Sequence, residues 1–235
     1  MSSHPSPIGR FALGLVALAL AAIVAPRSHG AAQTRIDART VAARVQAFHD
    51  QTQTFSATFY QTYYNKLYGR YDRARGVLAF KKPGRLRFDY SAPNGKLIVS
   101  DGEKLTVYEP GASGAAGQYF RSPMSDAAIP AAFTFLIGTS RLERDFSFRL
   151  LDASRWGFRG HVLELRPRRA NATYKNVILF VDADPARAGV VHRVLIIDHD
   201  GNRNKFELAS QRFNRPMNDG AFAWSPPRGA RRVQL

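Results

Sequence analysis

The sequence predicts a mainly β fold of the α+β class, in which helices cover one face of a strongly curved or barrel-like antiparallel sheet. About ten or eleven segments alternate apolar and polar residues with a period of two, and Gly, Pro, Asn and Asp clusters separate them. An amphipathic helical pattern precedes these segments, and a short apolar helical pattern interrupts them near the middle of the chain. Because both helical segments must bury an apolar side, we expect both on the same face of the sheet.

The first 32 residues have the order of a secretory signal peptide. A segment with a basic end, residues 1–10, precedes an apolar run over residues 11–25, and small residues follow at 30–32. The apolar run is shorter than the about 20 residues that span a membrane. We therefore expect cleavage after Ala32, which leaves residues 33–235 as one exported, soluble periplasmic domain. The alternative is an uncleaved anchor that lies in the membrane interface.

The balance of charges narrows the choice of partners. The chain has 34 Lys and Arg residues against 18 Asp and Glu, a formal net charge of +16. Such an excess favours anionic surfaces, either nucleic acid, phospholipid headgroups or lipopolysaccharide, and nucleic acid is the least suitable for an exported protein. The alternative is that the arginines only solvate the sheet. The chain contains no cysteine, so disulfides and thiol chemistry are excluded.

The regular elements follow one another in a simple order. Residues 37–51 place apolar side chains at helical spacing behind Asp37, a plausible N-cap, and therefore predict a helix. The period changes to two at residues 55–65, "FSATFYQTYYN", which are rich in aromatic and β-branched residues and predict the first strand. Further strands are predicted at residues 75–82, 85–90, 97–100, 104–108, 146–152, 161–166, 174–181, 190–198 and 205–213.

One region interrupts the strands. "GASGAAG" at residues 111–117 predicts a flexible loop, which leads through "QYFRSPMSDAAIP" into the apolar segment "AAFTFLIG" at residues 131–138. Ser125 is a suitable N-cap, and residues 131–138 predict two helical turns that end at Gly138.

The stretch "FKKPGRLRFDY" predicts a hairpin with two chemically different faces. Past the Pro83-Gly84 turn, Leu86 and Phe88 share one face, while Arg85 and Arg87 share the other. The arginines are therefore predicted on the solvent side and the apolar residues on the inner side. A platform for single-stranded nucleic acid needs both kinds on one face, so this segregation disfavours one.

Several of these segments resemble the periplasmic outer-membrane lipoprotein carrier proteins, the LolA family. The similar segments are "GVLAFKKPGRLRFDYSAP", "LIVSDGEKLTVYEP", "FTFLIG", "IIDHDGNRNKFELASQRFN" and the late "FAWSPPRGARRV". They stand in the family's order over the whole of residues 33–235. The resemblance implies an incomplete antiparallel barrel of about eleven strands, with a helical lid over its concave apolar face.

The resemblance also implies a function. In this family the cavity receives the acyl chains of lipoproteins released by an inner-membrane transporter, and the carrier delivers them to an outer-membrane receptor. It implies a monomer without a cofactor, and no nucleic acid as partner. Two alternatives on the same half-barrel stay open: a periplasmic protein that binds other lipids or glycolipids, and a lipid-sensing regulatory protein.

The candidate site consists of apolar residues, because acyl chains need non-directional burial. Cavity lining is expected from sheet residues and from the mid-chain insert: Phe55, Phe59, Leu78, Phe80, Leu86, Phe88 and Ile98, with Phe133, Phe135 and Leu136. Each could equally be ordinary core. The resemblance further implies a lid latch at Lys82, where the family typically has an arginine; the alternative is a surface lysine.

No pattern of catalytic residues is present in the sequence. It has no Gly-x-Ser-x-Gly motif, no phosphate-binding glycine loop and no nucleophile with an adjacent base. The histidines show no spacing typical of a zinc site. "DHDGNRN" at residues 198–204 superficially resembles a calcium loop, but its glycine stands fourth instead of sixth, which favours a hairpin turn. We therefore expect neither an enzyme nor a metalloprotein.

Overall fold

The computed structural model describes residues 36–112, 115–124, 141–170 and 172–234. These residues belong to one unit, Ile36–Leu235. The expected signal peptide (1–32), the insert helix (131–138) and its N-cap Ser125 lie outside the described residues. None of the helices in the described ranges has the length and hydropathy that a membrane crossing requires.

The chain enters the fold through helix α1, Ala38–Gln51. The Asp37 carboxylate accepts a hydrogen bond of 2.6 Å from the Thr40 backbone N–H, which satisfies one of the unpaired donors of the first turn. The predicted N-cap is therefore confirmed. The helix buries Val41, Ala42 and Val45, the apolar stripe that the helical spacing indicates.

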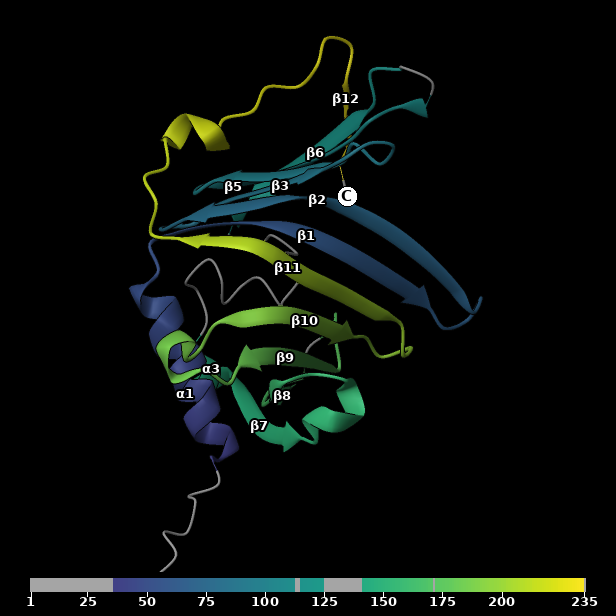
Figure 1. Cartoon of the computed structure of the whole chain (residues 1–235). Helices are drawn as coiled ribbons and strands as arrows, with labels where there is room; N and C mark the ends of the chain where they lie inside the picture. The colour runs from purple at the N-terminus through teal and green to yellow at the C-terminus, as the bar shows by residue number, and fades with distance from the viewer. Residues whose placement is uncertain (1–35, 113–114, 125–140, 171, 235) are drawn as a thin grey trace, which may run out of the picture. The chain divides into compact units, whose positions relative to one another are not determined.

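A curved sheet forms the rest of the fold (Figure 1). Its strands are β1 Thr54–Asn65, β2 Arg70–Lys81, β3 Arg85–Tyr90, β4 Leu97–Asp101, β5 Lys104–Glu109, β6 Gln118–Pro123, β7 Phe146–Leu151, β8 Gly160–Pro167, β9 Asn176–Asp182, β10 Val191–Ile197, β11 Arg203–Phe213 and β12 Arg231–Arg232. Short helices lie between them: α3 Leu142–Asp145, η3 Ala153–Trp156, η4 Pro185–Arg187 and η5 Asp219–Phe222.

The sheet is open. Its strand order among the described residues is β12-β6-β5-β4-β3-β2-β1-β11-β10-β9-β8-β7, so β12 and β7 form two separate edges. All neighbours pair antiparallel except β12, which runs parallel to β6. The predicted incomplete antiparallel barrel is therefore confirmed, with twelve strands in the described ranges.

Two strands lie where the sequence pattern indicated none. β6 occupies residues read as a continuation of the glycine loop, and it forms because β5 offers a full antiparallel partner from Lys104 to Glu109. β12 consists of two residues that pair with the outer edge of β6. The second strand also begins earlier than predicted, at Arg70, because β1 pairs with it along its whole length. The prediction was wrong at these places because pairing with a partner strand, and not local propensity, determines where these strands form and begin.

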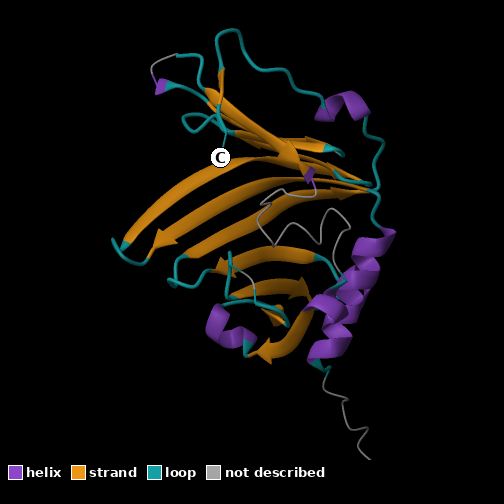
Figure 2. Cartoon of the chain, turned by 180° about the vertical axis from the view of Figure 1, so that it is seen from behind, coloured by secondary structure: helices purple, strands orange, loops and turns teal. Residues whose placement is uncertain are grey.

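The two faces of the sheet are covered differently. On the concave face, α1 packs across the end of the sheet where β1 begins and β11 ends (Figures 1 and 2). On the opposite, convex face, η3 and Trp156 cover a second apolar cluster formed by Val162, Ile178, Phe180 and Leu195.

The C-terminal segment, residues 214–232, covers another part of the convex face. Phe222 of η5 is buried, and η5 lies against β3 and β4. Asp219 pairs with Lys81 at 2.6 Å and with Arg85 at 3.4 Å, while Arg87 donates to the Ala221 carbonyl at 3.0 Å. The side chains of Arg85 and Arg87 are only 28% and 25% exposed. They lie on the outer side of the hairpin, as predicted, but they are partly covered because they hold this segment in place.

Candidate functional site

The concave face of the sheet is a continuous apolar surface. Six of the residues predicted to line a cavity lie in one buried cluster on it, each at most 4% exposed: Phe55, Phe59, Leu78, Phe80, Leu86 and Phe88. Ile98 is partly buried and packs against the same cluster. The three remaining predicted residues, Phe133, Phe135 and Leu136, lie outside the described residues. The alternation of side chains along β1, β2 and β3 accounts for this arrangement, because it sends every second residue to one face.

The second half of the sheet contributes as much to this surface as the first. The cluster includes residues from five further strands, β7 to β11, that were not predicted as site residues: Phe146, Leu163, Leu165, Val177, Leu179, Val181, Val194, Phe206 and Leu208. Each alternates with residues of the convex face, so the period of two carries the signal for them.

A β-bulge in β11 places one more aromatic residue on the concave face. The register between β1 and β11 shifts between Ser56 and Thr58, and Ser210 adopts a positive φ of 51°. The extra residue turns Phe213 inward, where its ring lies 5.1 Å from that of Phe55 and 4.9 Å from that of Phe48. A strict period of two would have sent Phe213 to the other face.

The described part of the surface is poor in polar groups, and burial keeps the Tyr90 phenol on it neutral. The Tyr90 ring lies 4.9 Å from that of Phe59. Burial raises the pKa of the Tyr90 hydroxyl to about 12, because the apolar surroundings disfavour the phenolate. Such a surface can bury hydrocarbon without directional contacts.

Helix α1 leaves little space beneath it. A cavity of about 40 Å³ lies between α1 and the sheet. Its lining comes from both: Val45, Phe48, His49, Thr52, Phe55, Phe80, Gly189, Val191, Val194, Leu208 and Phe213. Sites for small molecules typically measure about 300–1,000 Å³. An acyl chain therefore cannot enter here unless α1 moves away from the sheet.

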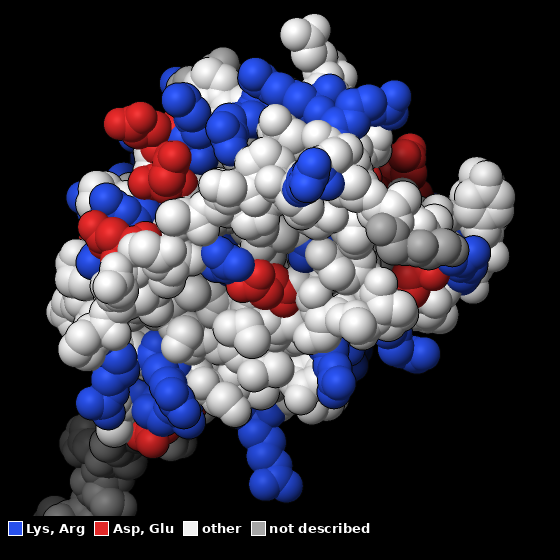
Figure 3. Space-filling model, turned by 90° about the horizontal axis from the view of Figure 1, so that it is seen from above, with Lys and Arg blue, Asp and Glu red and all other residues white. Residues whose placement is uncertain are grey.

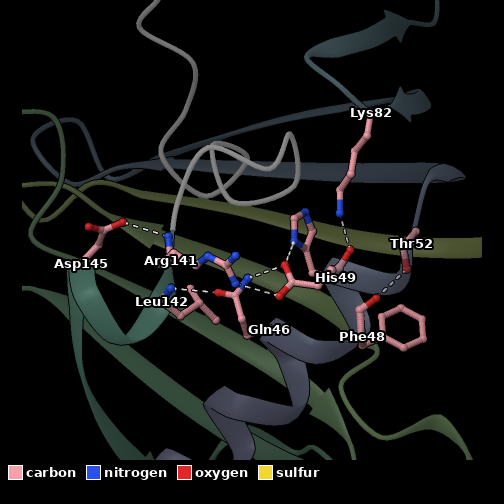
Figure 4. A network of polar contacts seen from close by, with 9 residues as sticks. Gln46, Phe48, His49, Thr52, Lys82, Arg141, Leu142 and Asp145 are labelled. Carbon is pink, nitrogen blue, oxygen red and sulfur yellow. Dashed lines mark hydrogen bonds and ion pairs between the residues drawn. The ribbon is translucent and has the colours of Figure 1, made fainter.

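Lys82, the predicted latch, contacts the last turn of α1 (Figure 4). Its ammonium group donates a hydrogen bond to the backbone carbonyl of His49, and the Thr52 hydroxyl donates to the neighbouring carbonyl of Phe48 at 2.8 Å. Carbonyls at a helix C-terminus are unpaired within the helix and carry partial negative charge. Burial and the nearby Arg141 charge lower the pKa of Lys82, against an opposing effect of Asp50.

A second set of polar contacts joins α1 to α3. Arg141 pairs with Asp50 at 3.0 Å, and the Gln46 side-chain oxygen accepts from the Leu142 backbone N–H at 2.9 Å (Figure 4). The ion pair lies at the surface, where it contributes modestly, whereas the hydrogen bond is partly buried. The apolar face of α1 is therefore its main attachment, and a few hydrogen bonds at its end fix its position.

The outer surface is strongly basic. Seen from above, Lys and Arg side chains form a band along one rim of the visible face, and acidic side chains are fewer (Figure 3).

The described residues contain no group of three or more His, Cys, Asp or Glu side chains that could hold a metal ion.

The chain is similar to a known protein family and to individual proteins. The family model described as "Outer membrane lipoprotein carrier protein LolA" matches residues 50–225. The outer-membrane lipoprotein carrier protein of Chromobacterium violaceum is 29% identical over 191 residues, 80% of this chain and 84% of the relative. That of Nitrosospira multiformis is 28% identical over 190 residues, 79% of this chain and 84% of the relative. A solved LolA superfamily protein of Nitrosomonas europaea covers 80% of this chain and 98% of its own, with 14% identity and a TM-score of 0.43.

Proposed function

The chain belongs to the outer membrane lipoprotein carrier protein family LolA, and from this premise we propose that it carries lipoproteins by sheltering their acyl chains on its concave face. The observation that supports this most is the continuous apolar cluster, which extends over both halves of the open sheet. An open sheet has room for hydrocarbon that a closed barrel of this size, filled by its own side chains, lacks.

The energetics favour a carrier that buries its cargo incompletely. Each buried CH₂ group contributes about 0.8 kcal/mol, so one chain of about 16 carbons contributes roughly 12 kcal/mol before costs. Several fully buried chains would exceed the affinity at which release remains possible. Displacing α1 exposes Val41, Ala42 and Val45 to water and so offsets part of the gain. A removable cover therefore keeps the net affinity in a useful range.

In this proposal Lys82 acts as the latch of the cover. Its hydrogen bond to the His49 carbonyl holds the C-terminal end of α1 over the cavity when no cargo is bound. A lysine lacks the planar fork with which an arginine could bond two carbonyls at once. We therefore propose a weaker latch than an arginine would give at this position.

The proposal includes the path that a lipoprotein takes from the inner to the outer membrane. The protein is exported, loses residues 1–32, receives acylated lipoproteins from a releasing transporter of the inner membrane and hands them to a receptor at the outer membrane. The apolar character of the described concave face supports a carrier.

The test is to identify what the protein carries. The protein is isolated from the periplasm of the producing cell without detergent, and bound material is identified by mass spectrometry. We expect lipoproteins with intact acyl chains, and an N-terminus at residue 33. Phospholipid or glycolipid in place of lipoprotein would contradict the proposal and support the alternative lipid-binding function.

A further inference from the structure

The turn between β1 and β2 exposes apolar side chains that no part of the described fold covers. Leu67 is 82% exposed and Tyr68 76% exposed. Tyr71 and Tyr60, on the same hairpin, are also exposed, and the ring of Tyr71 lies 4.7 Å from that of Tyr64. A contiguous exposed apolar patch with a polar rim marks an interaction site for a protein or a membrane.

Basic residues surround these side chains. Lys66, Arg70, Arg73 and Arg75 are exposed along the hairpin, and the Arg203 guanidinium on β11 lies 5.9 Å from the centre of the Tyr64 ring. The carboxylates nearby are Asp72, which pairs with Arg70 at 2.8 Å, and Asp200 in the turn before β11. The hairpin from residue 66 to 75 therefore has four cations against one carboxylate.

The hairpin also has an open edge beside these cations. β3 pairs with β2 only from Gly76 onward, so the outer edge of residues 70–75 is not covered by that strand. A surface groove of about 630 Å³ adjoins it. The groove is lined by Tyr60, Asp72, Arg73, Ala74, Arg75, Ser91, Ala92, Pro93 and Asn94. Guanidinium, hydroxyl and amide donors of this kind suit the phosphate of a lipid headgroup.

The hairpin end is far from the helix that covers the cavity. α1 packs at the start of β1, whereas the turn with Leu67 lies at the other end of this twelve-residue strand. At about 3.3 Å per residue the two places are roughly 40 Å apart. Figures 1 and 2 both show the β1–β2 hairpin extending beyond the neighbouring strands. A contact at this turn therefore leaves α1 and Lys82 unobstructed.

We propose that the β1–β2 hairpin docks on an anionic phospholipid surface, with Leu67 and Tyr68 entering the boundary between headgroups and acyl chains, and Lys66, Arg70, Arg73 and Arg75 contacting phosphates. Tyrosine is enriched at this boundary because its ring is apolar and its hydroxyl is polar. Basic residues near an anionic surface add attraction that salt screens. A stable protein partner would require about 800 Å² of surface on each side, more than two projecting side chains supply.

The proposal goes beyond the carriage of lipoproteins and does not depend on it. Docking would bring the carrier to a membrane while its concave face stays available. It requires no cargo, so it can be tested on protein without lipoprotein.

The experiment measures binding to vesicles by sedimentation. Protein isolated from the periplasm, with its N-terminus determined by mass spectrometry, is mixed with vesicles of phosphatidylcholine alone or with phosphatidylglycerol added. We expect binding only to the anionic vesicles, weakened by salt. The double variant Leu67→Ser, Tyr68→Ser should bind at least about tenfold more weakly, because it loses the two buried apolar side chains. The double variant Lys66→Gln, Arg73→Gln should lose roughly fivefold per cation at low salt.

Two matched controls separate the hairpin from the general charge and hydrophobicity of the surface. Val77→Ser removes another exposed apolar residue of β2, and Arg155→Gln removes an exposed cation of η3; neither should change binding. In a Tyr68→Trp variant, the emission of the new indole should shift to the blue on anionic vesicles.

Equal binding by the Leu67, Tyr68 double variant and the wild type would overturn the proposal. So would a change in oligomeric state without a change in vesicle binding, which would make this surface a contact between copies. Affinity for a fluorescent fatty acid, measured in parallel, reports separately on the proposed carrier function.

Discussion

Neighbouring residues of strand β3 point to opposite faces of the sheet and make different contacts. Leu86 and Phe88 lie buried on the concave face, while Arg85 and Arg87 on the same strand reach the C-terminal segment on the other face. Because Leu86 and Phe88 are buried in the cluster, a charge at either position would unfold the protein before it informed on lipid binding. Ile98 lies on the same face and is only partly buried, so it is the better position for such a test.

Ile98→Glu should weaken the binding of a fluorescent fatty acid by at least about tenfold, because it places a charge beside the hydrocarbon. The matched control is Val77→Glu, which changes a β-branched residue to the same acid on the convex side of β2, where Val77 is 52% exposed. It should leave the affinity unchanged. Circular dichroism checks that both variants fold. Equal affinities in the two variants would show that Ile98 does not face the bound chain.

Tyr90 should give the protein a measurable sensitivity to alkaline pH. Its pKa is raised from 10.0 to about 12 in the fold, so above pH 10 the unfolded chain loses the proton first. Stability should therefore fall as the pH rises from 10 to 12, by about 2–3 kcal/mol from this residue. Tyr90→Phe should remove that part of the loss. Urea unfolding of both proteins at several pH values checks this, and parallel pH profiles would contradict it.

At the scale of elements, α1 is the part of the described fold that is best suited to move. It covers the concave face through a short apolar stripe, and hydrogen bonds at its last turn fix its position. The strands beneath it are joined by continuous ladders of backbone hydrogen bonds. Local opening in proteins concentrates in elements with few such ties, which supports α1 as the cover.

Lys82→Met should loosen the end of α1. Losing the hydrogen bond to the His49 carbonyl costs about 1 kcal/mol, roughly a fivefold change in opening. Hydrogen exchange of the α1 amides and the release rate of a fatty acid probe should both rise by this factor. Lys104→Met, at an exposed position on β5, is the control, and Lys82→Arg should slow both rates again. Unchanged exchange in Lys82→Met would leave Lys82 as an ordinary surface lysine.

The bulge of β11 gives a second prediction about an element. Ser210 and Asn214 both have positive φ, 51° and 52°, a conformation that glycine adopts without strain. Ser210→Gly should stabilise the protein by about 0.5–1 kcal/mol. Asn214→Gly should destabilise it by about 1 kcal/mol, because the Asn214 side chain accepts from the Gln53 N–H at 2.7 Å and donates to the Gln51 carbonyl. Thermal unfolding measures both, and the same sign for both variants would contradict the assignment.

Most elements could be predicted from local patterns, and the exceptions share a cause. The alternation in residues 75–90 was sufficient to place Leu86 and Phe88 on the inner face, and Asp37 was sufficient to begin α1. The bulge at Ser210 and the contacts of Arg87 with the C-terminal segment depend on partners far away in the sequence, and β6 depends on β5 across the glycine-rich loop. Such partners leave no local signal, so the inward turn of Phe213 could not be predicted.

At the scale of the whole described unit, the two faces of the sheet differ in how their apolar residues are covered. On the convex face, η3 and the C-terminal segment cover most of the apolar residues. On the concave face, α1 covers an apolar surface through contacts that can be broken. Because the sheet is not closed, hydrocarbon can be added to one face without disturbing the other.

The last prediction tests this independence of the faces. Phe222 is buried beside β3 and β4 on the convex face, and Phe222→Ala removes this buried aromatic contact of residues 214–232. Removing a buried phenylalanine costs about 3–5 kcal/mol, but here a local detachment of the segment limits the loss. Trypsin should therefore cleave after the exposed Arg228 at least about tenfold faster, while the affinity for a fatty acid probe stays unchanged.

Phe158→Ala, in the other convex cluster, should not accelerate that cleavage. A loss of fatty acid binding in folded Phe222→Ala would show that the two faces are coupled, and the carrier would then need an intact outer face to hold its cargo.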